Sequence, residues 1–179
     1  LNDHIKSLHH FFEDNMESFL GYPCNGKFDY RPLYQFLDYP LNNVGDPFVS
    51  SNFTLNTHAV EREVINIFQN LTGADPKDTW GYCTNGGTEG NMYGLFLARE
   101  IYPKGIVYFS EETHYSVNKI IKCLNIDCVQ VKATSKGEMD INHLNNLLIE
   151  NKGRPAIMVC NVGTTMTGAI DDLDEIKKS

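Results

Sequence analysis

A glycine-rich stretch at residues 84–91 has the composition of a phosphate-binding loop. It reads Thr-Asn-Gly-Gly-Thr-Glu-Gly-Asn, and a run with helical spacing, Met92, Leu95 and Phe96, follows at once. Glycines let a backbone approach a ligand closely, and the free amides at a helix N-terminus attract an anion. Thr88 adds a hydroxyl donor. The same residues also suit a tight turn with Thr88 as a helix cap, so the loop alone leaves both interpretations open.

The spacing of this loop is also close to the Gly-x-Gly-x-x-Gly motif of dinucleotide-binding proteins. Gly87 and Gly90 match two of its glycines, but Asn85 replaces the first. Glu111 lies near the end of the next strand-like run, where an acid would bind a ribose. A dinucleotide-binding oxidoreductase is therefore an alternative. A Walker-type site fits less well because no Gly-Lys-Ser/Thr follows the glycines.

Two further polar segments have side chains that suit the same ligand. His114 follows a strand-like run, and an imidazole there can stack on a flat heteroaromatic ring or transfer a proton near neutral pH. A solvated or helix-capping histidine is the simpler alternative. Residues 161–168 place three threonines between two glycines, ahead of a helix expected near Asp171. An anion loop, a histidine and hydroxyl donors together describe a phosphorylated aromatic ligand better than three unrelated turns do.

The elements that must position these segments follow from an alternation of strand-like and helix-like runs. Strand-like runs occur at residues 80–84, 105–109, 128–132 and 156–161. The three helices between them are indicated by apolar residues at helical spacing: Met92, Leu95 and Phe96; Val117, Ile120, Ile121 and Leu124; Leu144, Leu147 and Leu148. This order predicts an α/β fold with a mostly parallel sheet, flanking helices, and ligands at the carboxyl ends of the strands.

The N-terminal part has a different pattern. A first helix, ended by Gly21-Tyr22-Pro23, is indicated by an apolar face at Ile5, Leu8, Phe12, Met16 and Phe19. Residues 38–57 are rich in Asn, Gly, Pro and Ser, which predicts a long ordered loop of the kind that tends to be functional. A second helix, capped by Gly73, is indicated by Val60, Val64, Ile67, Phe68 and Leu71.

Composition limits the classes of function. The 179 residues are 41% hydrophobic and 21% charged, which is typical of one soluble globular domain or most of one. The longest apolar runs are strand-sized, so we expect no membrane segment. A net charge of −8 disfavours nucleic-acid binding. Five cysteines without a Cys-x-x-Cys pair argue against a disulfide framework and a metal site, and with no visible secretion signal they favour the cytoplasm.

Residues 82–91, residues 113–117, and residues 161–165 with 168–172 together resemble the group II pyridoxal-phosphate-dependent amino-acid decarboxylases. Within that group the residues are most similar to bacterial histidine decarboxylases and plant serine decarboxylases. The resemblance implies that residues 57–179 are the N-terminal part of the large domain of a fold-type I enzyme, like aspartate aminotransferase. Residues 1–56 would be an N-terminal helical segment with a substrate and interface loop.

The resemblance also implies roles at matching positions. The cofactor would be pyridoxal 5′-phosphate, with its phosphate bound by Gly87 and Thr88. His114 would stack on the pyridine ring and assist proton transfer as the catalytic residue, and Thr165 would contact the other side of the cofactor. Asp171 matches an acidic position that we place among the cofactor-binding residues.

The implied substrate is an L-amino acid, and the loop from Asn42 to Asn56 would help to shape its pocket through Asn43, Asp46 and Pro47. Conversion of L-histidine to histamine and carbon dioxide is the first expectation, because the Gly86-Gly87 pair resembles the bacterial histidine enzymes. L-serine is the alternative, because Asp46-Pro47-Phe48 resembles the serine enzymes. The resemblance further implies a homodimer with the active site at its interface.

Two motifs of this family are missing from the sequence. The family needs a lysine that binds the cofactor covalently, in a Ser-x-His-Lys stretch, and an aspartate that pairs with the pyridine nitrogen, in a His-x-Asp stretch. Neither stretch occurs here. We therefore expect this chain to end before both motifs and to be inactive by itself, and a non-catalytic homologue remains an alternative.

Overall fold

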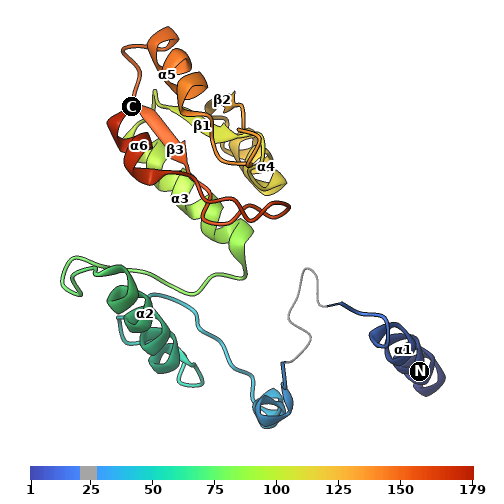
Figure 1. Cartoon of the computed structure of the whole chain (residues 1–179). Coiled ribbons are helices and arrows are strands. Elements are labelled where there is room, and N and C mark those ends of the chain that lie inside the picture. Colours follow the sequence, from blue (N-terminus) through green and yellow to red (C-terminus); the bar gives the residue numbers. More distant parts are fainter. Residues whose placement is uncertain (21–27) are drawn as a thin grey trace. The chain divides into compact units, whose positions relative to one another are not determined.

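The computed structural model describes residues 1–20 and 28–179, and these fall into two compact units, residues 1–82 and residues 83–179 (Figure 1). The predicted end of the first helix at Gly21-Tyr22-Pro23 lies outside the described residues.

The second unit is built on a three-stranded parallel sheet (Figure 1). Its strands are β1 (Ile106–Ser110), β2 (Asp127–Val131) and β3 (Ala156–Val159), in the order β2-β1-β3. All five residues of β1 are buried, as expected for an apolar strand that has a neighbour on each side and helices on both faces. The predicted parallel sheet is confirmed, with strand boundaries that differ by one or two residues.

Four helices accompany the sheet: α3 (Gly87–Ile101), α4 (Tyr115–Leu124), α5 (Ile141–Glu150) and α6 (Leu173–Lys178). Successive side chains of β1 point to opposite faces, which divides the core in two. One cluster unites Val107 and Phe109 with α3 and α4, and the other unites Ile106 and Tyr108 with α5 and α6. The three predicted helices are confirmed, and because the three strands are parallel, the turns that follow them lie at one edge of the sheet.

The predicted strand at residues 80–84 is wrong for this structure, because these residues pair with no strand among the described residues. The segment passes from one unit to the other. Its aromatic and β-branched composition suits a strand, but a strand also needs a hydrogen-bonding partner, which local sequence does not reveal. The predicted strand at 156–161 is shorter, because Asn161 pairs with Asp171 in an adjoining loop instead.

The first unit contains α1 (Asn2–Met16), a 3-10 helix η1 (Arg31–Asp38) and α2 (His58–Thr72). The α1 helix ends before Phe19, so its predicted length is wrong by about one turn. The α2 helix ends at Gly73, whose φ of 68° is the left-handed conformation predicted for this cap. Residues 39–57 contain no helix or strand, as predicted.

Much of the apolar surface of the first unit is exposed. The α1 helix has no buried residue, and the predicted apolar stripe of α2 is exposed at Val60, Ile67, Phe68 and Leu71. Among the described residues no helix is both long enough and apolar enough to cross a bilayer.

Candidate functional site

The glycine-rich loop leads directly into α3. Gly86 precedes the helix with φ 147°, a conformation that side-chain-bearing residues rarely adopt, and Gly87 is the first helical residue. No side chain caps the helix, so the alternative of Thr88 as a helix cap is wrong. Thr84 and Glu89 hold the loop in shape: the Thr84 hydroxyl donates to Gly86 O at 3.0 Å, and the Glu89 carboxylate accepts from Asn85 N at 2.8 Å.

The start of α3 forms an open cradle of backbone amides. The N–H groups of Gly87 and Thr88 have no acceptor within the described part of the chain. A Cβ added at Gly86 or Gly87 would meet no atom within 4 Å, so the space in front of these amides is clear. Free amides at the positive end of a helix attract an anion. This geometry fits the phosphate group that the sequence predicts here.

His114 follows β1 and caps α4. The backbone N–H of Ser116 donates to its Nδ1 at 3.3 Å, and the Ser116 hydroxyl lies 2.8 Å from the same nitrogen. Because a backbone N–H can only donate, Nδ1 is an acceptor, and this bonding pattern assigns the proton of the neutral ring to Nε2. The capping role weighed for this residue is thus present, and it leaves Nε2 for other chemistry.

The imidazole of His114 is exposed and has one face against a neighbouring ring. Its centroid lies 4.3 Å from the centroid of the Tyr115 ring, with a 37° angle between the planes. The Lys119 ammonium lies 4.5 Å from the centroid of the Tyr115 ring. A planar ligand would therefore use the imidazole face that is turned away from Tyr115.

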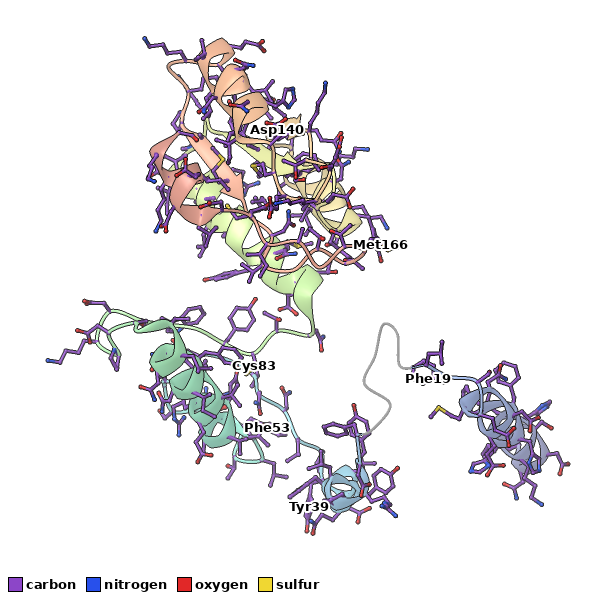
Figure 2. The ribbon with its side chains drawn as sticks, viewed as in Figure 1. Phe19, Tyr39, Phe53, Cys83, Asp140 and Met166 are labelled. Atoms are coloured by element: carbon purple, nitrogen blue, oxygen red, sulfur yellow. The ribbon has the colours of Figure 1, made fainter. Side chains whose placement is uncertain are left out.

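The three threonines in the loop after β3 differ in burial and in hydrogen bonding. Thr164 is buried, and its hydroxyl lies 2.6 Å from that of Thr167 and accepts from Ala169 N at 3.1 Å. Thr165 is exposed, and its hydroxyl has no hydrogen-bond partner among residues 28–179 of the structure. Met166, labelled in Figure 2, lies at the outer tip of this loop. Thr165 is thus the member whose hydroxyl remains available to a ligand, and its contact with the cofactor stays a prediction.

Asp171 lies in the interior rather than at the helix that follows it. Its Oδ1 accepts from Met139 N at 2.7 Å, and its Oδ2 accepts from Asn161 N at 2.6 Å and from Asn161 Nδ2 at 3.0 Å. Asp172 caps α6 instead. The predicted cofactor contact of Asp171 stays a prediction, and the structure adds a structural role that residue type alone did not indicate.

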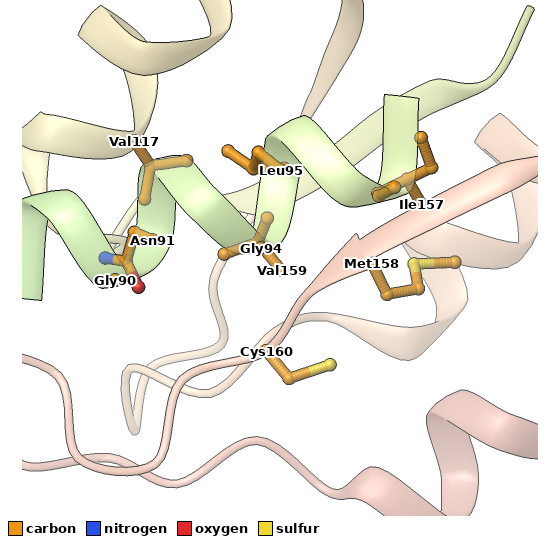
Figure 3. Close-up of a pocket in the computed structure, with 10 residues that line it drawn as sticks. Gly90, Asn91, Gly94, Leu95, Val117, Ile157, Met158, Val159 and Cys160 are labelled. Atoms are coloured by element: carbon orange, nitrogen blue, oxygen red, sulfur yellow. The ribbon is translucent and has the colours of Figure 1, made fainter. Parts of the chain in front are cut away.

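A cavity of about 330 Å³ runs between α3 and β3 (Figure 3). Gly90 and Gly94 lack side chains and leave room along the helix, while Cys160 lies at the carboxyl end of the strand. Burial, followed by the charge of Asp171, raises the pKa of the Cys160 thiol. Within the described residues no group of three His, Cys, Asp or Glu side chains is placed to hold a metal ion.

The predicted substrate-loop residues belong to the first unit, where they fix the loop to α2 and to the segment after it. Asn43 Oδ1 accepts from Thr57 N at 2.7 Å, and its Nδ2 donates to a Glu61 oxygen at 3.1 Å. The structure thus shows that Asn43 holds the loop in place, and its contact with a substrate stays a prediction.

Asp46 and Pro47 also bond the loop to neighbouring segments. Asp46 Oδ2 accepts from Trp80 Nε1 at 3.1 Å. Pro47 is buried, and its carbonyl accepts from Arg62 Nη1 at 2.5 Å. The loop is therefore held at several points along its length.

Glu111, the acid of the dinucleotide alternative, is also engaged. Its Oε1 accepts from Ala133 N at 3.1 Å and joins the ends of β1 and β2.

Thr113 and Asn161 were not among the predicted site residues, yet the Asn161 amide donates to Thr113 Oγ1 at 3.1 Å. The only sequence signal for these two residues was that they belong to the segments 113–117 and 161–165 of the resemblance.

Comparison with known proteins supports the expected resemblance. The profile of the pyridoxal-dependent decarboxylase conserved domain matches residues 56–178. A histidine decarboxylase from Mesorhizobium japonicum is 43% identical over 96% of this chain and 47% of its own length. Serine decarboxylase 2 from Oryza sativa subsp. japonica is 45% identical over 88% of this chain and 34% of its own length.

A solved structure shares the fold. The structure of L-methionine decarboxylase from Streptomyces sp. 590 with L-methionine methyl ester superposes with a TM-score of 0.86 at 25% identity. The match covers 97% of this chain and 46% of that one. This chain therefore spans about half the length, or less, of the relatives that it matches.

Proposed function

This chain belongs to the pyridoxal-dependent decarboxylase family, and from that membership we propose that the whole protein removes the α-carboxylate of an L-amino acid. Pyridoxal 5′-phosphate is the cofactor of the family. The observation that carries the proposal is the open amide cradle at the start of α3, which lies in the glycine-rich motif of the resemblance. A phosphate is the kind of group that such a helix N-terminus binds.

The described residues fit this cofactor. The amides of Gly87 and Thr88 would hold its phosphate, the free face of His114 would lie against its ring, and the Thr165 hydroxyl would contact it from the neighbouring loop. When bound, the cofactor would supply an electron sink for the electron pair that the departing carboxylate leaves on the α-carbon. The residues of this chain bind and orient it.

His114 is also the residue that we propose for proton delivery. Its Nδ1 is engaged by Ser116, so the proton of the neutral imidazole is on Nε2. Because the ring is exposed at the edge where the strands end, Nε2 can take up a proton from solvent and pass one to a reacting carbon of a bound ligand. Ser116 thereby fixes which nitrogen performs the transfer.

We propose L-histidine as the substrate, giving histamine and carbon dioxide, with L-serine as the alternative. Identities of 43% and 45% to a histidine and a serine decarboxylase support both nearly equally. The test is a carbon dioxide assay of the full-length protein with each amino acid, with the amine product identified by mass spectrometry. Release from histidine alone supports the first choice, and release from serine alone overturns it.

Two alternative functions can be distinguished from decarboxylation by cofactor-binding and carbon dioxide assays. A dinucleotide-binding oxidoreductase would bind a nicotinamide cofactor saturably and would not bind pyridoxal 5′-phosphate. The engagement of Glu111 by Ala133 and the family match argue against it. A non-catalytic homologue would bind pyridoxal 5′-phosphate and release no carbon dioxide from any L-amino acid. The same two assays on the full-length protein therefore distinguish all three.

We further propose a homodimer with the active site at its interface. The exposed apolar side chains of α1, among them Ile5, Leu8 and Phe12, support a covered position for this helix in the assembled protein. Light scattering of the full-length protein should give twice the chain mass, and a monomer would overturn this proposal. The domain boundary between residues 56 and 57 remains a prediction, supported by the start of the family match. The cytoplasmic location also remains a prediction, supported by the free thiols of Cys123, Cys128 and Cys160.

A further inference from the structure

A chain of hydrogen bonds joins the loops after β1 and β3. Its fixed end is the buried Asp171 carboxylate, which accepts from Met139 N and Asn161 N. The Asn161 amide nitrogen has two hydrogens, and it donates one to Asp171 Oδ2 at 3.0 Å and one to Thr113 Oγ1 at 3.1 Å. Thr113 and Asn161 are 48 residues apart in sequence but follow neighbouring strands of the sheet. We call this chain the Asp171–Asn161–Thr113 brace.

We propose that Asn161 and Thr113 are positioning residues, whose bond sets the spacing between His114 and Thr165. The inference rests on the proposed function, in which these two residues contact the cofactor ring from different loops. Thr113 directly precedes His114, so a shift of Thr113 would displace His114. Asn161 precedes the loop of Thr165, so the brace ties one side of the ring site to the other.

The chemistry of the groups fixes the orientation of the brace. An ionised aspartate can only accept, so the Asn161 atom that faces it must be the nitrogen, and the amide cannot rotate without losing that bond. Each carboxylate oxygen of Asp171 accepts a hydrogen bond from a backbone amide, and Asp171 is only 1% exposed. A buried acceptor with three donors is a rigid anchor, because any shift leaves a buried polar group unpaired.

The phosphate cradle is formed by other residues than those of the brace. Thr84 and Glu89 shape the glycine loop through bonds to Gly86 O and Asn85 N, whereas the brace joins residues that follow β1 and β3. Loss of the brace should therefore disturb contacts to the ring and leave the binding of a bare phosphate unchanged. This separation gives a readout that general damage to the fold would not produce.

The test compares three substitutions in the full-length, cofactor-free protein. Thr113→Val removes the hydroxyl and keeps the shape, while Thr113→Ser restores an acceptor. Thr134→Val is the matched control, since it removes a threonine hydroxyl that accepts from Lys136 N elsewhere. We expect Thr113→Val to weaken pyridoxal 5′-phosphate binding by roughly threefold to tenfold, the worth of one net hydrogen bond, and to leave the affinity for inorganic phosphate unchanged. Thr113→Ser and Thr134→Val should bind like the wild type.

Hydrogen exchange of the same cofactor-free proteins gives a second readout. Thr113→Val should speed amide exchange at residues 111–116 and at residues 161–168 together, because one bond restrains both loops. Unchanged cofactor affinity, or an equal loss of phosphate affinity, would overturn the inference. If the wild type binds no pyridoxal 5′-phosphate, the proposed function fails, and the exchange pattern still decides whether the brace exists.

Discussion

Gly137 lies against Thr167 so closely that a Cβ added to the glycine would clash with the threonine hydroxyl and lie 3.2 Å from its Cβ. The contact joins the turn between β2 and α5 to the loop that contains Thr165. Gly137 also has φ +85°, a conformation that L side chains rarely adopt. Two separate physical reasons therefore require glycine here.

Gly137→Ala should lower the free energy of unfolding by about 2 to 4 kcal/mol, from backbone strain together with the steric clash. Gly153→Ala is the matched control, since Gly153 has φ +98° and an added Cβ there meets nothing within 4 Å. It should cost about 1 kcal/mol from strain alone. Denaturant unfolding of both proteins measures the difference. Equal losses would mean that the turn moves aside without cost.

His114→Ala should remove the α4 cap and lower stability by about 1 kcal/mol while abolishing most of the turnover of the full-length protein. His114→Asn separates these two effects, because asparagine is a good N-cap residue without an imidazole. We expect it to recover the stability but not the turnover. Carbon dioxide release and thermal unfolding are the two measurements. Normal turnover in His114→Asn would remove the ring from the chemistry.

Asp171→Asn should lower the free energy of unfolding by about 2 to 4 kcal/mol, because the new amide hydrogens face backbone donors in the interior. The same change at the neighbouring residue, Asp172→Asn, is the control. Asp172 caps α6, and asparagine and aspartate cap about equally well, so its effect should be close to zero. Similar stabilities of the two variants would contradict the anchoring role of Asp171.

Cys160 should react slowly with iodoacetamide at pH 8, compared with the same residue in the urea-unfolded chain. Burial, followed by the charge of Asp171, raises the pKa of its thiol above its ordinary value, and the thiolate is the reactive form. Because the folded state favours the protonated thiol, its contribution to stability is fully present below the unfolded pKa and is lost as the pH rises through the higher folded pKa. Mass spectrometry at successive pH values measures the rate. Equal rates for folded and unfolded chains would show that the shift is absent.

The sequence predicted most of the second unit because each crossover helix and each strand has its own local periodicity. It failed at residues 80–84, since ladder pairing depends on residues far away in the chain. It placed His114 and the glycine loop correctly at the ends of helices, as the caps of α3 and α4 show.

The sequence could not predict the different roles of adjacent residues of the same type. Thr164 and Thr165 are the same residue type, and only packing shows that the first is buried and the second exposed. Asp171 and Asp172 both suit the start of a helix, yet one of them faces the interior because Met139 and Asn161 offer backbone donors there. Such choices are made by tertiary contacts rather than by local preference.

The central position of β1 also has a consequence for the order of folding. Its two parallel ladders join residues far apart in sequence, so neither can form before a crossover segment has closed. Amides of β1 should consequently exchange only through global unfolding. His114 follows this strand by a few residues, so its loop is attached to the strand that we expect to open last.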